Sequence, residues 1–364
     1  MAIPLVIVGG FLGAGKTTLL WQAARRLAAQ GMRVGLITND QAPDLVDTGL
    51  LLRQGLDVRE ETGSCFCCNF TALLEAADAL KNRLHADVLI AEPVGSCADL
   101  SATILQPLKD RHAQDYRLAR LSVLADPSRI EGVFDPKLTD LHPSAAYIVR
   151  KQLEEADIVL LNKADQLSAA EASALGARVK TAFPGTELRL VSALTGQGVD
   201  EWLASTQSDG PVGRKILEID YDTYAEGEAA LGWLNADIAL ASTGPEVDWR
   251  AFSEALMGSL RDKFLRRNAA VGHVKILLSS DTETLTANLT RTRGSVSLRG
   301  DVSRSSSAEL VVNARVELSP DELESTVRAA VAAAAGTEIR ARFRTLRSLR
   351  AGRPNPTYRY AEAI

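Results

Sequence analysis

Up to about residue 205, short apolar runs rich in β-branched residues alternate with longer stretches in which apolar residues recur every three or four positions. The short runs predict β-strands, and the longer spacing predicts amphipathic helices. The first helix is expected to begin at Gly15 and to end before Gly31, a residue type suited to closing a helix. The expected strands cover residues 3–8, 33–38, 88–91, 120–125, 158–161 and 188–191. This alternation predicts an α/β fold with a mostly parallel sheet, helices on both faces, and ligands at the carboxyl ends of the strands.

The pattern changes after residues 206–213, where Thr, Ser, Gly and Pro residues predict a linker. Beyond this point strand-like runs follow one another with few helices between them, which favours a smaller α+β module with an antiparallel sheet. Strands are expected at 215–219, 236–240, 273–278, 284–289, 295–298, 310–318 and 338–346, and helices at 245–264 and 320–335, the second capped by Ser319. We therefore expect two domains, residues 1–207 and residues 208–364.

The composition is that of an ordinary folded protein. The 364 residues include 46% hydrophobic and 24% charged residues, which argues against a fibrous or wholly disordered chain. The formal net charge of −5 gives no basic field to attract nucleic acid or anionic lipid. No apolar run approaches the roughly 20 residues of a membrane span, and no signal peptide is recognisable. We expect a cytoplasmic location, with neither membrane nor nucleic acid as a partner.

A phosphate-binding loop follows the first predicted strand. The segment Gly-Phe-Leu-Gly-Ala-Gly-Lys-Thr fits the pattern G-x-x-x-x-G-K-[ST] and precedes the first helix. Glycines let backbone N–H groups approach phosphate oxygens, and the helix N-terminus favours negative charge. Lys16 is expected to reach the β- and γ-phosphates, and the Thr17 hydroxyl to ligate Mg²⁺. The expected nucleotide contacts of this loop are Gly10, Gly13, Ala14, Gly15, Lys16, Thr17 and Thr18.

Two further loops predict that the base is guanine. Asn162, Lys163 and Asp165 follow an apolar strand, and a carboxylate at that place accepts hydrogen bonds from guanine N1–H and its exocyclic amine. Ser192 and Ala193 follow the next strand, where a backbone amide would meet guanine O6. GTP and GDP are therefore expected rather than adenine nucleotides. A small-molecule kinase or ligase that uses the same phosphate loop remains an alternative, which phosphorylated product would reveal.

Three of the four cysteines, Cys65, Cys67 and Cys68, lie within four residues just before a predicted helix near residue 69. Thiols so close together do not suit a disulfide framework, and thiolates near a helix N-terminus favour metal binding. Three sulfurs suit Zn²⁺ or Co²⁺, and the candidates for a fourth ligand include Glu61, Cys97, water or a group on a client protein. An open position favours an ion that can be transferred. A structural zinc and a redox sensor are the alternatives.

The combination of these motifs resembles the CobW-type P-loop GTPases. It comprises the phosphate loop, Cys-x-Cys-Cys about fifty residues later, Glu-Pro-Val-Gly at the end of the third expected strand, and Asn-Lys-Ala-Asp. That family is related to the urease and hydrogenase maturation GTPases and contains cobalt and zinc chaperones. The resemblance implies a P-loop NTPase fold and GTP hydrolysis. By the same resemblance Cys65, Cys67 and Cys68 are metal cysteines.

The resemblance also implies residues near the γ-phosphate. Glu92 corresponds to the acid near magnesium or the attacking water, and Asn39 and Asp40 to a pair after the second strand, with Asp47 further along the presumed switch. We therefore take Lys16, Thr17, Asp40 and Glu92 as the catalytic candidates. Because no arginine finger and no water-positioning glutamine can be assigned from the sequence, slow intrinsic turnover is expected.

These inferences favour a GTPase metallochaperone that delivers zinc or cobalt to a client metalloprotein. The alternative is a GTP-dependent assembly factor for a corrinoid enzyme or metalloenzyme in which the metal is structural, and a homodimer is compatible with either. The chain has no histidine-rich run, so metal storage is not expected, although His273 on a strand of the second domain could face a client. Alternating Arg340, Arg342 and Arg344 are interpreted as a solvated strand face, with an anionic partner as the alternative.

Overall fold

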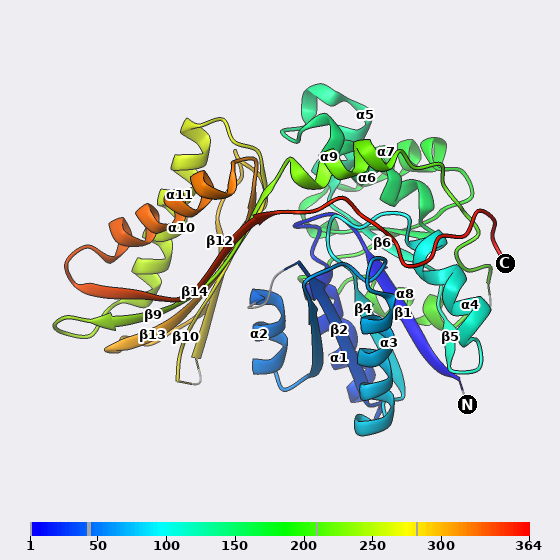
Figure 1. Ribbon diagram of the computed structural model, residues 1–364, viewed down its shortest axis with the longest axis horizontal. Helices are drawn as coiled ribbons and strands as arrows, with labels where there is room; N and C mark the ends of the chain where they lie inside the picture. Colours follow the sequence, from blue (N-terminus) through cyan, green and yellow to red (C-terminus); the bar gives the residue numbers. More distant parts are fainter. Residues whose placement is uncertain (1, 42–44, 209, 282) are drawn as a thin grey trace.

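Two β-sheets of different character divide the chain (Figure 1). The structure is a computed structural model that describes residues 2–41, 45–208, 210–281 and 283–364. The first sheet is parallel in all its described pairings, and its strands come from residues before 191. The second sheet is antiparallel and lies beside the first domain. The predicted fold class, an α/β domain followed by a smaller α+β domain, is confirmed.

The first sheet has the strand order β3-β2-β4-β1-β6-β7-β8, with β5 paired to β1. The six predicted strands are all present within a few residues of their expected bounds. Two strands were missed: β3 carries mostly charged residues and β5 has only three residues, so neither shows an apolar run. The bounds are β1 Ile3–Gly9, β2 Val34–Asp40, β3 Asp57–Thr62, β4 Val88–Glu92, β5 Tyr116–Leu118, β6 Ser122–Ala125, β7 Ile158–Leu161 and β8 Glu187–Leu190.

Helices cover both faces of this sheet, so its central strands are buried on both sides. On one face α1 and α8 bury Leu19, Leu20 and Trp202, and on the other face α3 and α6 bury Phe70 and Ile148. The helix at residue 70 begins at the N-cap Asn69, as expected. The α-helices of this half are α1 Lys16–Ala29, α2 Val46–Arg53, α3 Phe70–Ala79, α4 Gln106–His112, α5 Pro127–Phe134, α6 Pro143–Glu155, α7 Ala169–Ala182, α8 Val199–Gln207 and α9 Tyr221–Ala229.

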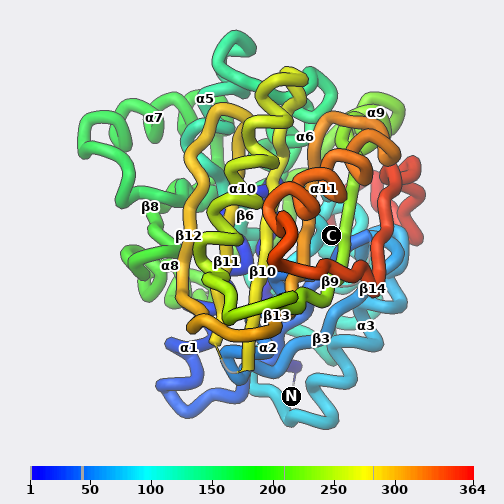
Figure 2. The backbone as a smooth tube through the Cα atoms, turned by 90° about the vertical axis from the view of Figure 1, so that its left-hand side faces the viewer, coloured from blue at the N-terminus to red at the C-terminus, as the bar shows by residue number. Residues whose placement is uncertain are grey.

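The second sheet has the order β12-β11-β10-β13-β9-β14. Its apolar face packs against α10 and α11, and its other face is turned toward the first domain (Figures 1 and 2). Ser319 caps α11 together with Glu322, as the sequence predicted. The elements are β9 Gly232–Ser242, α10 Trp249–Arg266, β10 Val271–Ser280, β11 Glu283–Leu289, β12 Ser297–Asp301, β13 Ser307–Val316, α11 Pro320–Ala335 and β14 Ile339–Arg350.

The strand predicted at residues 215–219 was wrong. This segment is irregular, and its Lys215 ammonium donates to the carbonyl of Ala156 at 2.9 Å. Ile219 packs against the core of the first domain, which accounts for the apolar pattern without a strand. Of the predicted linker at 206–213, Asp209 lies outside the described residues, and Gly213 is fixed by a hydrogen bond to Asp157.

After β14 the chain returns to the first domain, where residues 351–364 run across its surface (Figure 1). We call this segment the tail. Its Tyr358 ring stacks edge-on against Phe70 of α3 with ring centroids 5.4 Å apart, and Arg359 binds Asp99 at 2.7 Å. Within the described residues, none of the helices has the length and apolar character needed to cross a membrane.

Candidate functional site

The phosphate loop has the conformation that its glycines predict. It connects β1 to α1, and Gly10, Gly13 and Gly15 all have positive φ, a region that glycine alone adopts readily. A Cβ atom on Gly10 would lie 2.2 Å from the Leu124 carbonyl oxygen. The Lys16 ammonium donates to the Gly10 carbonyl at 2.9 Å, so it folds back over the loop. The loop therefore forms a cradle with its lysine at the centre.

An oxygen-rich cluster lies beside this cradle at the carboxyl ends of β2 and β4. The Thr17 hydroxyl donates to Glu92 at 3.0 Å, and Lys16 lies 3.6 Å from the same carboxylate. Burial raises the pKa of Glu92 and lowers the pKa of Lys16. Thr17 also interacts with Asp47 on α2. A hydroxyl and two carboxylates are the ligand types that Mg²⁺ prefers, so the donor set fits the ion.

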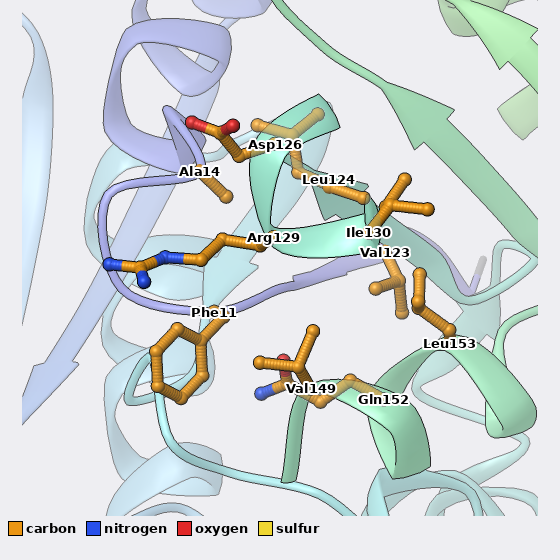
Figure 3. A pocket seen from close by; sticks show the side chains of 11 residues that line it. Phe11, Ala14, Val123, Leu124, Asp126, Arg129, Ile130, Val149, Gln152 and Leu153 are labelled. Carbon is orange, nitrogen blue, oxygen red and sulfur yellow. The ribbon is translucent and has the colours of Figure 1, made fainter. Parts of the chain in front are cut away.

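A cavity of about 740 Å³ opens over the cradle, and residues of both domains line it. It is large enough for a nucleotide. From the first domain the predicted residues Lys16, Thr17, Asp40 and Glu92 line it, together with Gly13, Gly15, Thr18 and Lys163. From the second domain His273 and Lys275 line it. A second pocket behind the loop, with a volume of about 10 Å³, is too small for a nucleotide (Figure 3).

At the far end of the cavity Asn162 joins two predicted loops. Its side-chain amide donates to the Ala14 carbonyl at 2.7 Å, and its oxygen accepts from the Ala193 N–H at 2.8 Å. Lys163 forms an ion pair with Asp126. Asp165 is exposed and is not among the residues that line the cavity, although its neighbour Gln166 is. Ser192 is buried behind Ala193.

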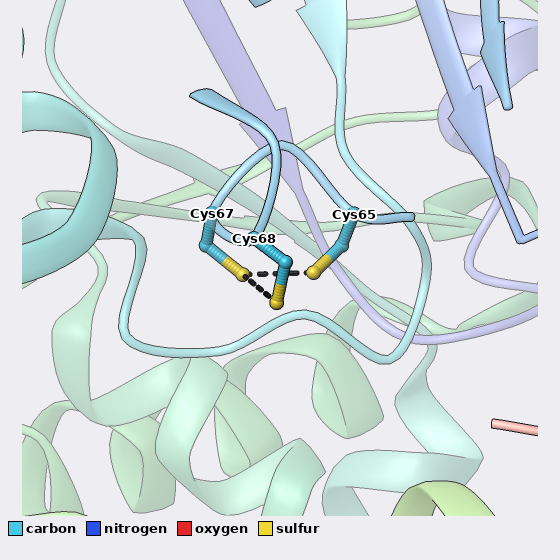
Figure 4. A group of neighbouring side chains, drawn as sticks. All are labelled: Cys65, Cys67 and Cys68. Atoms are coloured by element: carbon cyan, nitrogen blue, oxygen red, sulfur yellow. Dashed lines mark hydrogen bonds between the residues drawn. The ribbon is translucent and has the colours of Figure 1, made fainter. Parts of the chain in front are cut away.

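The three cysteines form a compact cluster in the loop between β3 and α3 (Figure 4). The Sγ atoms are 2.8 Å apart for Cys65 and Cys67, and 3.8 Å apart for Cys67 and Cys68. Tetrahedral zinc with Zn–S bonds of about 2.3 Å separates its sulfurs by about 3.8 Å, so one pair already has that spacing. The hydrogen bond with Cys67 holds the pKa of Cys65 well below its usual range. A ready thiolate next to two thiols fits a soft or borderline cation.

Of the two candidate extra ligands, only Cys97 is close to the cluster. Its thiol is buried and interacts with Cys65 and Cys67, whereas Glu61 interacts with Glu75 and does not join the sulfurs. Next to Cys97, Ser96 binds the carboxyl group of Glu228 on α9. Burial raises the pKa of Glu228 to about 8. The three-sulfur cluster thus has two buried members and a half-buried Cys68, with the buried thiol of Cys97 nearby.

Asn39 links the cavity to the cysteine loop. It lines the cavity at the end of β2, and its side-chain amide donates to the carbonyls of Glu61 at 3.1 Å and Ser64 at 2.8 Å. Asp40, the next residue, binds Arg315 of the second domain at 2.7 Å. Asn39 and Asp40, which the sequence identified only by resemblance, therefore connect the cavity, the cysteine loop and the second domain.

Sequence reasoning missed the contacts that the tail makes with the cysteine loop. The backbone N–H of Asn355 donates to Cys68 Sγ at 3.2 Å, and Thr357 binds the carbonyls of Cys67 and Cys68. It also missed Lys275 and Arg315, which lie on the face of β10 and β13 opposite the apolar core. The sequence feature that could have indicated these two residues is a charged side chain at alternate positions of a strand. Such a pattern predicts a polar face, but it does not tell which surface that face contacts.

The comparisons with known proteins agree with this architecture. The sequence profile described as CobW/HypB/UreG, nucleotide-binding domain, matches residues 4–188. The chain belongs to this family. The matched region contains the phosphate loop, the cysteine loop and Asn162, and it ends before the second domain.

Several relatives of this CobW/HypB/UreG protein carry names that mention zinc. The zinc chaperone CobW of Pseudomonas aeruginosa is 28% identical over 224 residues, 54% of this chain and 57% of that protein. The zinc chaperone YjiA of Escherichia coli is 29% identical over 175 residues, 46% of this chain and 52% of that protein. The chain spans about half the length of these relatives. The alignment with the crystal structure of zinc-bound YjiA GTPase from E. coli covers 92% of this chain and 100% of that chain. The sequence identity is 18% and the TM-score is 0.39.

Proposed function

We propose that this protein binds GTP, hydrolyses it to GDP and phosphate, and couples the reaction to the binding and release of a transition metal ion. The observation that carries the proposal is the Asn39 side chain, which lines the cavity and holds the backbone of the cysteine loop. Zinc is the first candidate for the cargo because the relatives are described as zinc chaperones. Cobalt remains the second, since the same thiolates bind both ions.

In this mechanism the phosphate loop binds the triphosphate through backbone N–H groups and Lys16. Mg²⁺ would be held by Thr17 with Asp47 or Glu92, and it would supply positive charge next to the β- and γ-phosphates. Asn162 fixes the loop that carries Ala193 against the phosphate loop, and Asp165 selects guanine. Loss of the γ-phosphate changes the forces on Asn39 and Asp40, and the backbone of the cysteine loop moves with them.

The ion is the cargo of this cycle, held by Cys65, Cys67 and Cys68 with Cys97 as the fourth sulfur. Delivery to a client metalloprotein requires that the affinity for the ion differ between the GTP and GDP states. The matching experiment measures zinc affinity by chelator competition with a non-hydrolysable GTP analogue and with GDP. A tenfold or larger difference supports the proposal, and equal affinities refute it.

One observation favours the second candidate, a GTP-dependent assembly factor with a structural metal. Cys65 and Cys67 are 3% and 2% exposed, and the tail covers the loop that carries them. A closed, buried sulfur site is typical of structural zinc. The discriminating result is retention of the ion against a strong chelator throughout GTP turnover, whereas a chaperone loses the ion to the chelator as it hydrolyses GTP.

A further inference from the structure

Strand β10 of the second domain forms a wall of the nucleotide cavity next to the phosphate end. His273 and Lys275 are two residues apart on this strand, so both side chains point to the same face. Both line the cavity together with Lys16 and Thr17. The alternate residues Val274 and Ile276 point into the core under α10 and α11. Strand β10 therefore presents two nitrogen-bearing side chains to the cavity.

Lys275 lies within the charged cluster around the magnesium ligands. Its ammonium is 2.5 Å from the Asp47 carboxylate, and the two side chains are 16% and 19% exposed. Asp47 also contacts the Thr17 hydroxyl, so one carboxylate connects Lys275 to the phosphate loop. The charge of Lys275 acts on Lys16 and Glu92. These relationships put Lys275 beside the phosphate-binding lysine.

His273 has an unused hydrogen-bonding atom at the same wall. Among the described residues its Nδ1 is one of the buried side-chain atoms with no hydrogen-bond partner, and the residue is 6% exposed. Burial, together with the charges of Lys275, Arg315 and Lys16, holds the pKa of His273 well below its usual range. A buried polar atom without a partner costs free energy, which a ligand in the cavity can recover.

Several contacts anchor this wall to the first domain. Arg129 donates to the carbonyls of Val271 at 2.8 Å and Thr290 at 2.7 Å, at the start of β10 and just after β11. Asn313 accepts from the Val46 N–H at 2.7 Å, and Ser279 accepts from Arg53 at 2.9 Å. Both of the last contacts hold α2. A charge on such a frame is preorganised, which is the condition for electrostatic catalysis.

We propose that Lys275 is a catalytic residue that the second domain supplies to the γ-phosphate of GTP, with His273 as a hydrogen-bonding neighbour. The inference rests on the proposed GTPase function and gives it an intramolecular cation from the second domain. Water oxygen forms the new bond to the γ-phosphorus, and the bond to the β–γ bridging oxygen breaks with its electrons left on GDP. The protons of the water end on phosphate and solvent, and Lys275 keeps its own.

The rival interpretation is that Lys275 and Asp47 form a structural ion pair between the domains. A comparison of Lys275→Met and Lys275→Arg with the wild-type protein distinguishes the two interpretations. Lys263→Met on α10 is the control outside the cavity. For Lys275→Met we expect kcat to fall about 100-fold, the loss typical of removing one preorganised charge or donor. We also expect weaker binding of a non-hydrolysable GTP analogue with little change for GDP. Lys275→Arg should recover part of kcat, and the control should match wild type.

A Lys275→Met protein with wild-type kcat, or with equal losses of affinity for the GTP analogue and GDP, overturns the inference. Thermal unfolding of each variant shows whether the domains remain folded, and Lys275→Arg supplies the answer if the methionine variant does not fold. If the wild-type protein itself does not hydrolyse GTP, the proposed function fails. In that case the ratio of analogue to GDP affinity still tests whether Lys275 contacts the terminal phosphate.

Discussion

The side-chain oxygen of Asn39 accepts a hydrogen bond from the backbone N–H of Phe66 at 3.0 Å. Phe66 lies between Cys65 and Cys67, and Asn39 lies at the end of β2 in the wall of the nucleotide cavity. With the two hydrogen bonds from its amide group, this residue makes three contacts to the cysteine loop. Asn39 therefore ties the end of β2 directly to the backbone that carries Cys65 and Cys67.

Replacing Asn39 with alanine should uncouple metal affinity from nucleotide state. The variant loses all three side-chain contacts, so we expect zinc affinities in the GTP-analogue and GDP states to become equal within about twofold. Asn69→Ala is the matched control, because this N-cap is next to the cysteines but outside the cavity. The control should lose about 1 kcal/mol of stability and keep the difference. Persistent coupling in Asn39→Ala would contradict the role given to this residue.

Asp165→Asn should change the base that the cavity prefers. In the proposed function the carboxylate accepts two hydrogen bonds from guanine, each worth roughly 1.5–3 kcal/mol, so we expect GDP affinity to fall about 100-fold or more. Xanthine carries an oxygen where guanine has its amine, and the asparagine amide can donate to that oxygen. Fluorescent-nucleotide titration with GDP and XDP measures the exchange. Unchanged GDP binding would mean that another residue at this end, such as Gln166, selects the base.

Cys97→Ala should weaken the metal site. If Cys97 supplies the fourth sulfur, Co²⁺ in the variant loses one thiolate, and the intensity of its sulfur-to-metal charge-transfer band falls. We expect zinc affinity to fall at least tenfold in one or both nucleotide states. Glu61→Gln is the matched control, since Glu61 does not join the sulfur cluster. Identical spectra and stoichiometry for wild type and Cys97→Ala would remove Cys97 from the ligand set.

Asn355→Pro should weaken zinc binding through the backbone alone. Proline lacks the N–H that donates to Cys68 Sγ at 3.2 Å, whereas Asn355→Ala keeps that donor and is the natural control. Loss of a hydrogen bond to a metal-binding sulfur typically costs 10- to 100-fold in affinity, and we expect the lower part of this range. Chelator competition measures the zinc affinity of each variant. Equal zinc affinities for the proline and alanine variants would show that the tail has no effect on the sulfur.

Glu155 should make the protein less stable as the pH rises. This carboxyl group is fully buried at the end of α6, and burial raises its pKa well above the ordinary 4.5. The folded state therefore holds the proton more tightly than the unfolded state, so the stability from this group is complete below about pH 4.5 and is lost as the pH rises toward the folded pKa.

Glu155→Gln removes this titration. We expect the variant to gain about 1–3 kcal/mol relative to wild type at pH 8.5, and to differ little from it at pH 4.5, as measured by urea unfolding. Glu154→Gln is the control, because the neighbouring Glu154 is half-buried and already paired with Arg150 and Lys151. A wild-type to Glu155→Gln difference that does not depend on pH would contradict the assignment.

The first domain could be predicted well because its chemistry is local in sequence. The phosphate loop, the strand–helix alternation and the cysteine triplet each occupy a short segment, and the geometry of such segments follows from residue type and spacing. Strand β3 was not predicted, because an edge strand with charged residues has no apolar pattern. The strand at residues 215–219 was predicted wrongly because the segment is apolar. Apolar side chains of an irregular segment can pack onto a core without any hydrogen bonds to a neighbouring strand.

Contacts between distant segments could not be predicted. The ion pairs of Arg315 with Asp40 and Lys275 with Asp47 join residues more than two hundred positions apart. A strand with charged side chains at alternate positions indicates a polar face, but the surface that it meets depends on the packing of two whole domains. The same holds for Asn355, whose contact with Cys68 uses the backbone N–H and so does not depend on the type of side chain.

The chain passes between the domains at two neighbouring points. It leaves at Gly232 and returns at Arg350, and these residues face each other at the ends of β9 and β14. Two tethers attached side by side permit rotation about the line that joins them but little separation. Because the returning tether continues into the tail, whose Asn355 contacts Cys68, a single short stretch of chain connects the sheet that borders the nucleotide cavity to the cysteine loop.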